Sequence, residues 1–546
     1  MKKQVIAVML VLCLNAPVCQ GEEVSTATGE AVQKRTPQNT DYYRLEQNLK
    51  ERRTEQEPIQ DNTGKPGETA QQDKSITVFV RKIVTTPSQI LTADEIESVV
   101  SQYEGKTISM KELNDVVKKL NALYRQKQYI TAQALLPSQK IENGIVNIQL
   151  VEGHVGQIYV ENNRHTNLNY IKDRLTLQPG NLLKLNELEK DLTFFNRTND
   201  IQLQAELRPG KEFGATDLIL KTQEPVNSQA TLFSDNGGRK ESGLYRTGLT
   251  WVDSSLTGWR DTLSVTAIQA KDTTAGSFSY YMPVDTQGTR VGVSYDKNQT
   301  SVSSGAYESL DIKGNSDDFA VYLSHPFRVT PQYKSEGYLE WHNKTSDTSF
   351  SGITLLNNKV KTGVAGASFQ SIGNNRFWYM RNDFTFGNSD SRVHDFFRYN
   401  LSYVQQRWLS HGNLLIFRAN GQWANKELLP SSEQFSLGGM SSVRGFPEGL
   451  KNGDKGYCVS AELDMPVRPD SKTKFMTFID HGGTFTLKGN REGVDHNDFL
   501  TSVGCGVILN FSKYESGKIA IGFPLSSQTT YRQHVRVHFF LQSTIF

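Results

Sequence analysis

The chain has 546 residues, and 60 Lys and Arg against 58 Asp and Glu give it a formal net charge of +2. This balance, without a block of basic residues, argues against a nucleic-acid-binding protein, so we expect no nucleic-acid partner. Mean hydropathy is −0.50, and no run of 18 apolar residues follows the N-terminus, which argues against a helical membrane span. Aromatic residues make up 10% of the chain and glycines number 43, which leaves a soluble β-rich protein and a transmembrane β-barrel equally open.

Residues 1–21 are predicted to be a secretory signal peptide. Lys2 and Lys3 supply its basic start, and the apolar stretch 5–14 is too short to cross a membrane. We expect ordinary cleavage near residues 19–21. The mature protein is therefore predicted to lie outside the cytoplasm.

The cysteines predict neither a disulfide nor a metal site. Cys13 and Cys19 lie in or beside the signal, which leaves Cys458 and Cys505. Strand alternation places these two on opposite faces, so a bond between them is not expected. Their spacing matches no metal motif.

Residues 22–75 are polar and rich in Gln, Glu, Thr and Lys, as expected of a linker. Within them a helix is predicted at about residues 41–56, because Thr40 is a good N-cap and Pro58 ends the helical pattern. Its thin apolar face is formed by Tyr42, Leu45 and Leu49. Such a face suits a wet cavity such as a barrel lumen, and the alternative is a marginal helix in a disordered tail.

Residues 76–225 contain two copies of one β-α-α-β-β pattern, each about 75 residues long, at 76–153 and 154–225. Each copy buries its helices on one face of a sheet and leaves an edge strand. An edge strand can accept an extended peptide as an added strand. The alternative is a small α+β domain without a partner. The expected strands are 76–84, 131–136, 145–150, 156–161, 202–207 and 216–221, and the expected helices are 93–102, 111–126, 168–175 and 185–196.

From residue 226 to 546 the helical periodicity vanishes and strands of about 9–13 residues follow one another. About 16 such strands are expected, an even number as in bacterial outer-membrane barrels. Short and long connections alternate, which a barrel with short periplasmic turns and long outer loops explains and a β-sandwich does not. The expected short turns are 285–288, 371–375 and 410–412, and the expected long loops are 301–317, 346–357, 387–396, 426–456 and 487–497.

The long loop 426–456 carries the most informative motif, Val443-Arg444-Gly445-Phe446. Val443 and Phe446 are apolar in a loop that should face water, and Gly445 lets the backbone approach another surface closely. These features favour a loop that folds inward, although most loop arginines are simply solvated.

A second motif, Phe478-Ile479-Asp480-His481-Gly482, follows on the next predicted strand. Asp480 shares a face with Phe478 and Gly482, because side chains alternate along a strand. An Arg and an Asp in two such settings predict a charge-assisted contact in the barrel lumen. His481 points to the opposite face from Asp480 and cannot work with it as an acid–base pair.

Catalytic, nucleotide-binding and metal motifs are absent from the sequence. We therefore expect no enzyme activity and no cofactor.

The whole chain resembles the two-partner secretion transporters, which belong to the outer-membrane assembly superfamily. The resemblance rests on the signal peptide, the helix with its linker, two POTRA-like repeats, about 16 strands, the two motifs and Phe546 at the end. It implies a transmembrane β-barrel of about 16 antiparallel strands, two periplasmic α+β POTRA-like domains and an N-terminal plug helix. The loop motif looks like the hallmark of the sixth outer loop, and the second motif like its partner on the thirteenth strand.

The resemblance also implies a function. The protein would be an outer-membrane translocator that secretes a large exoprotein through its barrel without ATP, and its repeats would bind the exoprotein's N-terminal secretion domain. The exoprotein would be an adhesin, a haemolysin or a contact-dependent growth-inhibition toxin. Arg444 would pair with Asp480, and residues 41–53 would plug the lumen. The plug residues expected from the resemblance are Asp41, Tyr42, Leu45, Leu49 and Arg52.

Further partners implied are outer-membrane lipid and, during biogenesis, the barrel-assembly machinery; the protein itself would be a monomer. The repeats would lie in the periplasm of a Gram-negative bacterium and the long loops outside the cell. Three alternatives remain. A barrel-assembly factor of the same superfamily usually has more POTRA repeats and no plug helix, a diffusion porin needs no repeats, and a surface enzyme would need a catalytic motif.

Overall fold

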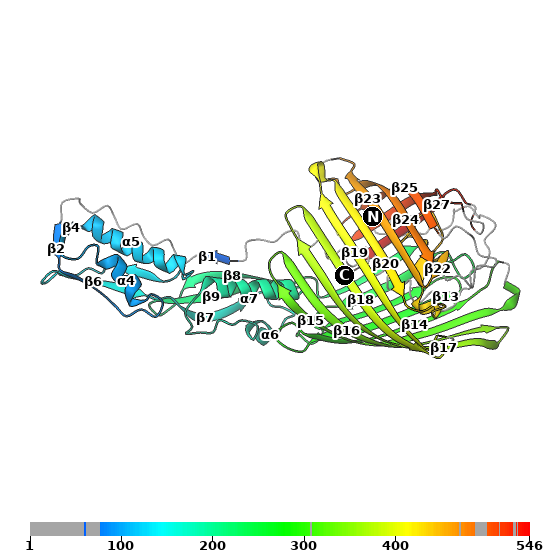
Figure 1. Ribbon diagram of the computed structural model, residues 1–546, viewed down its shortest axis with the longest axis horizontal. Coiled ribbons are helices and arrows are strands. Elements are labelled where there is room, and N and C mark those ends of the chain that lie inside the picture. Colours follow the sequence, from blue (N-terminus) through cyan, green and yellow to red (C-terminus); the bar gives the residue numbers. More distant parts are fainter. Residues whose placement is uncertain are drawn as a thin grey trace. The chain divides into compact units, whose positions relative to one another are not determined.

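The computed structural model describes residues 59–61, 77–305, 308–391, 393–468, 471–485, 499–512, 514–527, 531 and 533–545. The predicted signal peptide, the predicted plug helix and Phe546 lie outside these residues. Thr54–Pro225 forms one compact unit, which holds both repeats, and Val226–Phe546 belongs to a second unit, which holds the barrel (Figure 1). In the described part of the chain, no helix has the length and apolar character that a membrane crossing requires.

The first repeat has the expected strands and helices in the expected order, but it also has a strand between its two helices, β4 (Lys106–Ser109), which the sequence pattern did not predict. Both helices begin with a capping box, Thr92 with Glu95 and Ser109 with Glu112, in which each pair satisfies two amide groups of the first turn. The expected strand 76–84 is wrong in one respect, because it breaks into two at Arg81, whose amide donates to the carbonyl of Gly144 instead. The elements are β2 (Thr77–Val80), β3 (Lys82–Thr85), α4 (Ala93–Val100), β4 (Lys106–Ser109), α5 (Met110–Gln126), β5 (Gln133–Leu135) and β6 (Ile145–Val151).

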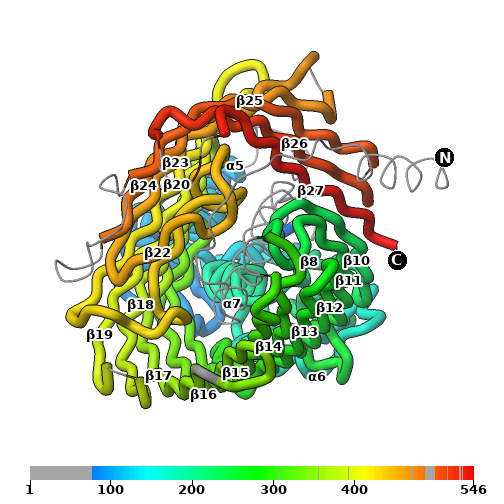
Figure 2. Tube along the Cα trace, turned by 90° about the vertical axis from the view of Figure 1, so that its right-hand side faces the viewer, coloured from blue at the N-terminus to red at the C-terminus, as the bar shows by residue number. Residues whose placement is uncertain are grey.

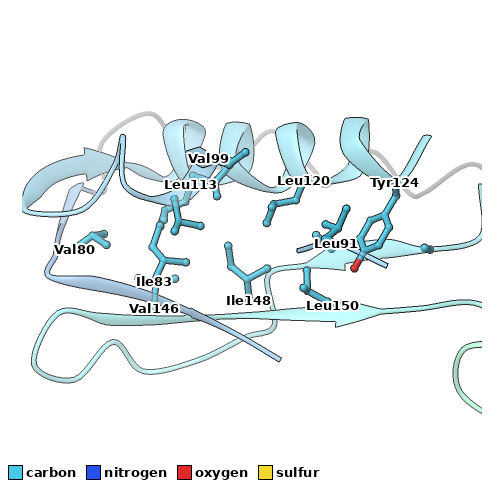
Figure 3. Packing of buried hydrophobic residues seen from close by; sticks show 14 of the residues in the cluster. Val80, Ile83, Leu91, Val99, Leu113, Leu120, Tyr124, Val146, Ile148 and Leu150 are labelled. Atoms are coloured by element: carbon cyan, nitrogen blue, oxygen red, sulfur yellow. The ribbon is translucent and has the colours of Figure 1, made fainter. Parts of the chain in front are cut away.

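One apolar stripe of α5 forms the core of the first repeat (Figure 3). Leu113, Leu120 and Tyr124 recur at helical spacing and are fully buried. They face the buried side chains of β6, among them Ile148 and Leu150. The helical spacing of these residues explains why the sequence predicts the 111–126 helix.

The second repeat contains β7 (His154–Glu161), α6 (Leu168–Lys172), α7 (Leu185–Thr198), β8 (Gln202–Pro209) and β9 (Ala215–Gln223). Its sheet has the order β1-β8-β9-β7, where β1 is Ile59–Asp61 from the predicted linker. The sequence did not predict β1. The two repeats interlock, because Leu182 packs against the core of the first and Ile130 against the core of the second.

Sixteen of the described strands of the second unit form a closed antiparallel barrel, ordered along the chain and closed by β10 against β27 (Figure 2). Its first eight strands are β10 (Ser228–Asp235), β11 (Arg246–Asp253), β12 (Thr262–Gln269), β13 (Thr273–Pro283), β14 (Arg290–Ser301), β15 (Ile312–Val329), β16 (Tyr333–Phe350) and β17 (Ile353–Ile372). The others are β18 (Arg376–Ser389), β19 (Asp395–Trp408), β20 (Leu414–Ala424), β23 (Lys455–Pro466), β24 (Lys474–Phe485), β25 (Phe499–Asn510), β26 (Glu515–Pro524) and β27 (Arg536–Thr544).

Exposure alternates along the barrel strands. On β24, Ile479 is 52% exposed whereas Asp480 is fully buried. The outward positions carry large apolar side chains, such as Leu249, Phe278, Phe319, Trp341, Phe384, Phe417 and Phe523. An apolar exterior over a polar interior is the pattern of a barrel in lipid.

One of the expected long loops is wrong and another ends too late. Residues 346–357 form the tip of a hairpin between β16 and β17, joined only by Ser351 and Gly352, and β15 already begins at Ile312 within the expected loop 301–317. Ser351 and Gly352 both have positive φ, as a primed hairpin turn requires. These strands have 18 to 20 residues, or about 60 Å, well beyond what lipid can cover, so their tips are polar and looked like loops.

Candidate functional site

The candidate site is the segment between β20 and β23, the eleventh and twelfth strands of the barrel, which we call the inward loop (residues 425–454). The loop has structure of its own. It contains the 3-10 helix η3 (Ser431–Glu433) and the paired strands β21 (Phe435–Leu437) and β22 (Lys451–Gly453). The buried carboxylate of Asp454 accepts hydrogen bonds from the amides of Leu428 and Leu429, both at 2.9 Å. These contacts brace the loop internally.

Arg444 fastens the loop to the barrel wall. Its Nε and NH2 donate to the two carboxylate oxygens of Asp480 at 2.8 Å each, and its backbone amide donates to Asp480 at 3.0 Å. Its NH1 donates to Glu462 on β23, and NH2 also reaches Ser460 at 3.2 Å. All four residues are buried. The pairing of Arg444 with Asp480, expected from the sequence, is thus present as a bidentate contact.

Glu462 is a second carboxylate at this site, and it was missed at the sequence level. Besides Arg444 it binds Lys518 on β26 at 2.9 Å and lies 3.6 Å from Arg418 on β20. Three cations therefore converge on one fully buried carboxylate. The only sequence signal was that Glu462 shares the inward face of β23 with Ser460 and Cys458, so its partners were not predictable.

Val443 and Phe446 anchor the loop by apolar contacts. Both are fully buried, in a cluster that also holds Leu437, Leu500 and Tyr531. The ring centroids of Phe446 and Tyr531 are 5.7 Å apart. These side chains stay out of water, as their apolar character required.

Gly445 lies against the wall formed by β26 and β27. Its φ is +95°, and a Cβ there would lie 3.1 Å from the carbonyl carbon of Gly522. Its amide donates to Nε2 of His538 at 3.0 Å, and its carbonyl accepts from the hydroxyl of Tyr531 at 3.2 Å. The close approach expected for Gly445 is therefore present, whereas no sequence pattern singled out His538.

Phe478 and Gly482 form the slot on β24. The Arg444 guanidinium carbon lies 3.5 Å from the centre of the Phe478 ring, a cation–π contact. A Cβ on Gly482 would lie 2.6 Å from Cδ1 of Leu437, so the missing side chain makes room for the loop. The small and aromatic inward positions of this motif thus accommodate the inserted segment.

A second ionic anchor holds the base of the loop on a different part of the wall. The fully buried carboxylate of Glu433 binds Lys344 on β16 at 2.8 Å and Arg398 on β19 at 3.0 Å. These are the seventh and tenth strands, whereas the partners of Arg444 lie on the twelfth and thirteenth. The loop is therefore fixed at two separated places on the lumen wall.

Cys458 and Cys505 are free, in agreement with the sequence prediction. The proposed plug residues Asp41 to Arg52 lie outside the described residues.

The family of the chain follows from a match to a known family model. A model described as haemolysin secretion/activation protein ShlB/FhaC/HecB matches residues 214–509, more than half of the chain. The chain belongs to this family. A model of the ShlB-type POTRA domain also matches residues 78–153, which is the first repeat.

Individual relatives extend the similarity over most of the transporter. The heme/hemopexin transporter protein HuxB of Haemophilus influenzae is 26% identical over 472 residues, covering 82% of this chain and 83% of HuxB. The structure of CdiB from Escherichia coli has a TM-score of 0.67 at 19% identity and covers 96% of this chain and 99% of its own. The structure of BamA from Haemophilus ducreyi, lacking POTRA domains 1–3, has a TM-score of 0.54 at 14% identity. It covers 86% of this chain and 100% of its own.

Structural likeness at such low identity shows only that the fold is shared. Because CdiB and BamA both share it, the fold alone does not separate a transporter from an assembly factor. The family match makes that distinction. The protein is a two-partner secretion transporter of the outer membrane, with its repeats in the periplasm and its loops outside the cell.

Proposed function

We propose that this transporter recognises one large exoprotein in the periplasm through its two repeats and passes it through the barrel as an extended chain. The observation that carries the proposal is the inward loop, which is held in the lumen by Arg444 on Asp480 and Glu462. A loop fixed in this way gives the passing chain one defined inner surface, so the proposal requires the loop to stay anchored during export. The family match supports the same reading.

The inner wall supports passage of an unfolded chain. An extended chain carries unpaired backbone groups, which a polar surface can satisfy. Acidic and basic side chains pair along the lumen side of β16 and β18. Such pairs include Lys334 with Glu336 at 2.8 Å and Arg381 with Glu340 at 2.9 Å. Because the acidic and basic side chains of this wall neutralise one another, the wall does not bind an acidic or a basic segment of the exoprotein tightly. Chains of varied sequence can therefore slide along it.

We further propose that export uses no ATP. Nucleotide motifs are absent from the sequence. Folding of the exoprotein outside the cell would bias movement outward, because a folded domain cannot return through the barrel. In this proposal the protein acts as a monomer with neither enzyme activity nor a cofactor, inserts with help from the barrel-assembly machinery, and contacts lipid through its apolar exterior.

The cargo belongs to one of a few classes. The family resemblance implies an adhesin, a haemolysin or a contact-dependent growth-inhibition toxin. HuxB is named as a heme/hemopexin transporter protein, so we add to these classes an exoprotein that binds heme or hemopexin. We propose testing that class first, because HuxB matches over four fifths of both chains.

The experiment that tests this function is deletion of the gene in its native host. We expect one large exoprotein to disappear from the surface and the medium, while other outer-membrane proteins keep their amounts. A general loss of outer-membrane barrels would instead favour the assembly-factor alternative.

A further inference from the structure

The second repeat holds a strand that does not come from its own sequence segment. β1 pairs in parallel with the outer side of β8, with Ile59 opposite Ala205, Gln60 opposite Glu206 and Asp61 opposite Leu207. Ile59 is half-buried and packs against the apolar core of this repeat. A sheet edge that already binds one extended segment is chemically suited to bind another.

The equivalent edge of the first repeat is closed by side-chain amides. Asn121 on α5 accepts from the amide of Ala134 on β5 at 2.7 Å and donates to its carbonyl at 3.3 Å. Gln139 does the same for Asn147 on β6, at 2.7 Å in both directions. Pro137, which lies between Ala134 and Gln139 in the chain, has no amide hydrogen that could pair with an added strand. An added strand would find these backbone groups already satisfied.

The second repeat repeats only part of this arrangement. Asn196 on α7, 75 positions after Asn121, holds Leu203 on β8 in the same way, at 2.7 Å and 3.0 Å. β8 then runs on to Pro209, and Ala205–Leu207 is the part that β1 covers. The amide cap and β1 thus divide the outer side of β8 between them.

We propose that the outer side of β8 at Ala205–Leu207 is the docking edge for an extended segment of the exported polypeptide, and that β1 occupies this edge until the cargo arrives. The proposal rests on the secretion function proposed above. The cargo segment would lie parallel to β8 with an apolar side chain in the place of Ile59. Its arrival would exchange one strand for another at the same edge.

The exchange is feasible because the two strands satisfy the same backbone groups. Glu206, in the middle of the edge, is bound by Arg208 and Lys221 at 2.6 Å each, so it offers no uncompensated charge to an incoming strand. β1 covers only three residues of β8. A longer cargo strand would therefore replace it with at least as many contacts.

The test is a disulfide that locks β1 in place in the full chain. Ile59→Cys and Ala205→Cys put two thiols on register partners of neighbouring strands, where the spacing suits a disulfide, and the periplasm is oxidising. The cargo is the exoprotein that disappears when the gene is deleted, and its amount in the medium is measured. Each single variant is a matched control, because it carries one of the two substitutions but cannot form the bond between β1 and β8. It also shows whether the new cysteine pairs with Cys458 or Cys505 instead.

We expect the bond to form. Export by the doubly substituted chain should then fall roughly tenfold, because almost no transporter molecules have a β8 edge that is free to bind cargo. Both single variants should export normally. Failure of the bond to form, or full export by a locked chain, would overturn the proposal while leaving the secretion function intact. Absence of export by the unsubstituted chain would instead reject the secretion function itself, and this proposal with it.

A second variant changes the edge in the opposite direction. Ile59→Asp places a charge where β1 meets the apolar core. Burying that charge is unfavourable, so β1 should detach and leave the outer side of β8 free. We expect the purified full chain with Ile59→Asp to bind the N-terminal segment of the same exoprotein roughly threefold more tightly or better, because competition by β1 is reduced. Equal or weaker binding would contradict occupation of this edge by β1.

Discussion

Gly445 in the inward loop and Gly522 on β26 are in direct backbone contact, and a Cβ on Gly445 would lie 3.1 Å from the Gly522 carbonyl carbon. Neither position has room for a side chain. The contact brings the loop against the fifteenth strand, while Arg444 holds it to the twelfth and thirteenth. The glycine is thus as much a part of the anchor as the arginine beside it.

Gly522→Ala should therefore push the loop off the wall. We expect an inserted barrel with reduced export, because the added methyl group would collide with the backbone of Gly445. Export and the protease sensitivity of residues 425–454 are the measurements. Gly363→Ala is the control, since a Cβ there meets nothing within 4 Å. Equal export by the two variants would show that the close approach has no role.

Arg444→Ala should weaken secretion while the barrel still inserts. Removing one partner of a buried ion pair costs roughly 3–5 kcal/mol, and less in a wet lumen. A loss of only ~1.4 kcal/mol changes the loop's equilibrium tenfold, so export should fall by about that factor or more. Arg376→Ala, at an exposed arginine of β18, is the control. Normal secretion by a well-expressed Arg444→Ala protein would rule out the role.

Arg444→Lys distinguishes geometry from charge. Lysine keeps the positive charge but cannot make the two parallel contacts with Asp480 or lie flat on Phe478 in the same way. We expect export by this variant to fall between that of the wild type and that of Arg444→Ala. Full export by Arg444→Lys would mean that charge alone holds the loop.

Glu433→Gln should loosen the base of the loop without touching the Arg444 contact. The amide leaves Lys344 and Arg398 without their shared carboxylate, so the loop should fluctuate more and single-channel current should become noisier. Glu427→Gln, at an exposed residue of the same loop, is the control. Restoration by the charge swap Glu433→Lys with Lys344→Glu would support a direct pair, and quiet channels in Glu433→Gln would argue against it.

Deleting residues 41–53 should raise single-channel conductance if these residues plug the lumen. The segment has a thin apolar face that suits a wet cavity rather than a core. Deletion of a stretch of equal length from the polar residues 62–75 is the matched control. Unchanged conductance after the first deletion would identify residues 41–53 as a tail.

Asp191 in the second repeat should make the stability of that repeat depend on pH. Burial raises the pKa of its carboxyl, opposed by hydrogen bonds from Thr176. A raised pKa in the folded state means that the free energy of unfolding falls as pH rises from the unfolded value, about 3.9, to the folded value. Above this pH window the ionised carboxylate therefore lowers the free energy of unfolding. Below the window the carboxyl group is protonated in both states and has no such effect.

Asp191→Asn should therefore raise the melting temperature of the repeats at neutral pH and leave it nearly unchanged in acid. The described α-helices all lie within residues 93–198, so the helical circular dichroism signal follows the repeats rather than the barrel. Glu189→Gln, at an exposed residue of the same helix, is the control. A lower melting temperature for Asp191→Asn at neutral pH would contradict this assignment.

The sequence predicted what short-range patterns encode. The stripe of α5 gave the helix, alternation gave the barrel, and two compact motifs gave Arg444 and Asp480. Glu433 and Lys344 are 89 positions apart, and only closure of the barrel brings them together. Glu462 looked like any inward polar residue until Lys518 and Arg418 were placed around it.

Two features depended on surroundings that no local pattern shows. The hairpin tip at Ser351 and Gly352 extends past the lipid, so its strands lack the apolar alternation that marks the others. β1 is three residues in a polar stretch, and it is a strand only because the outer side of β8 is there to pair with it.

The most direct test of the central claim is export of the exoprotein in a heterologous host, with the full chain and with a chain that lacks residues 76–225. Insertion of both barrels is verified by their heat-modifiable migration on gels. We expect exoprotein at the surface and in the medium only with the full chain. Equal export without the repeats, or no export with the full and inserted chain, would contradict it.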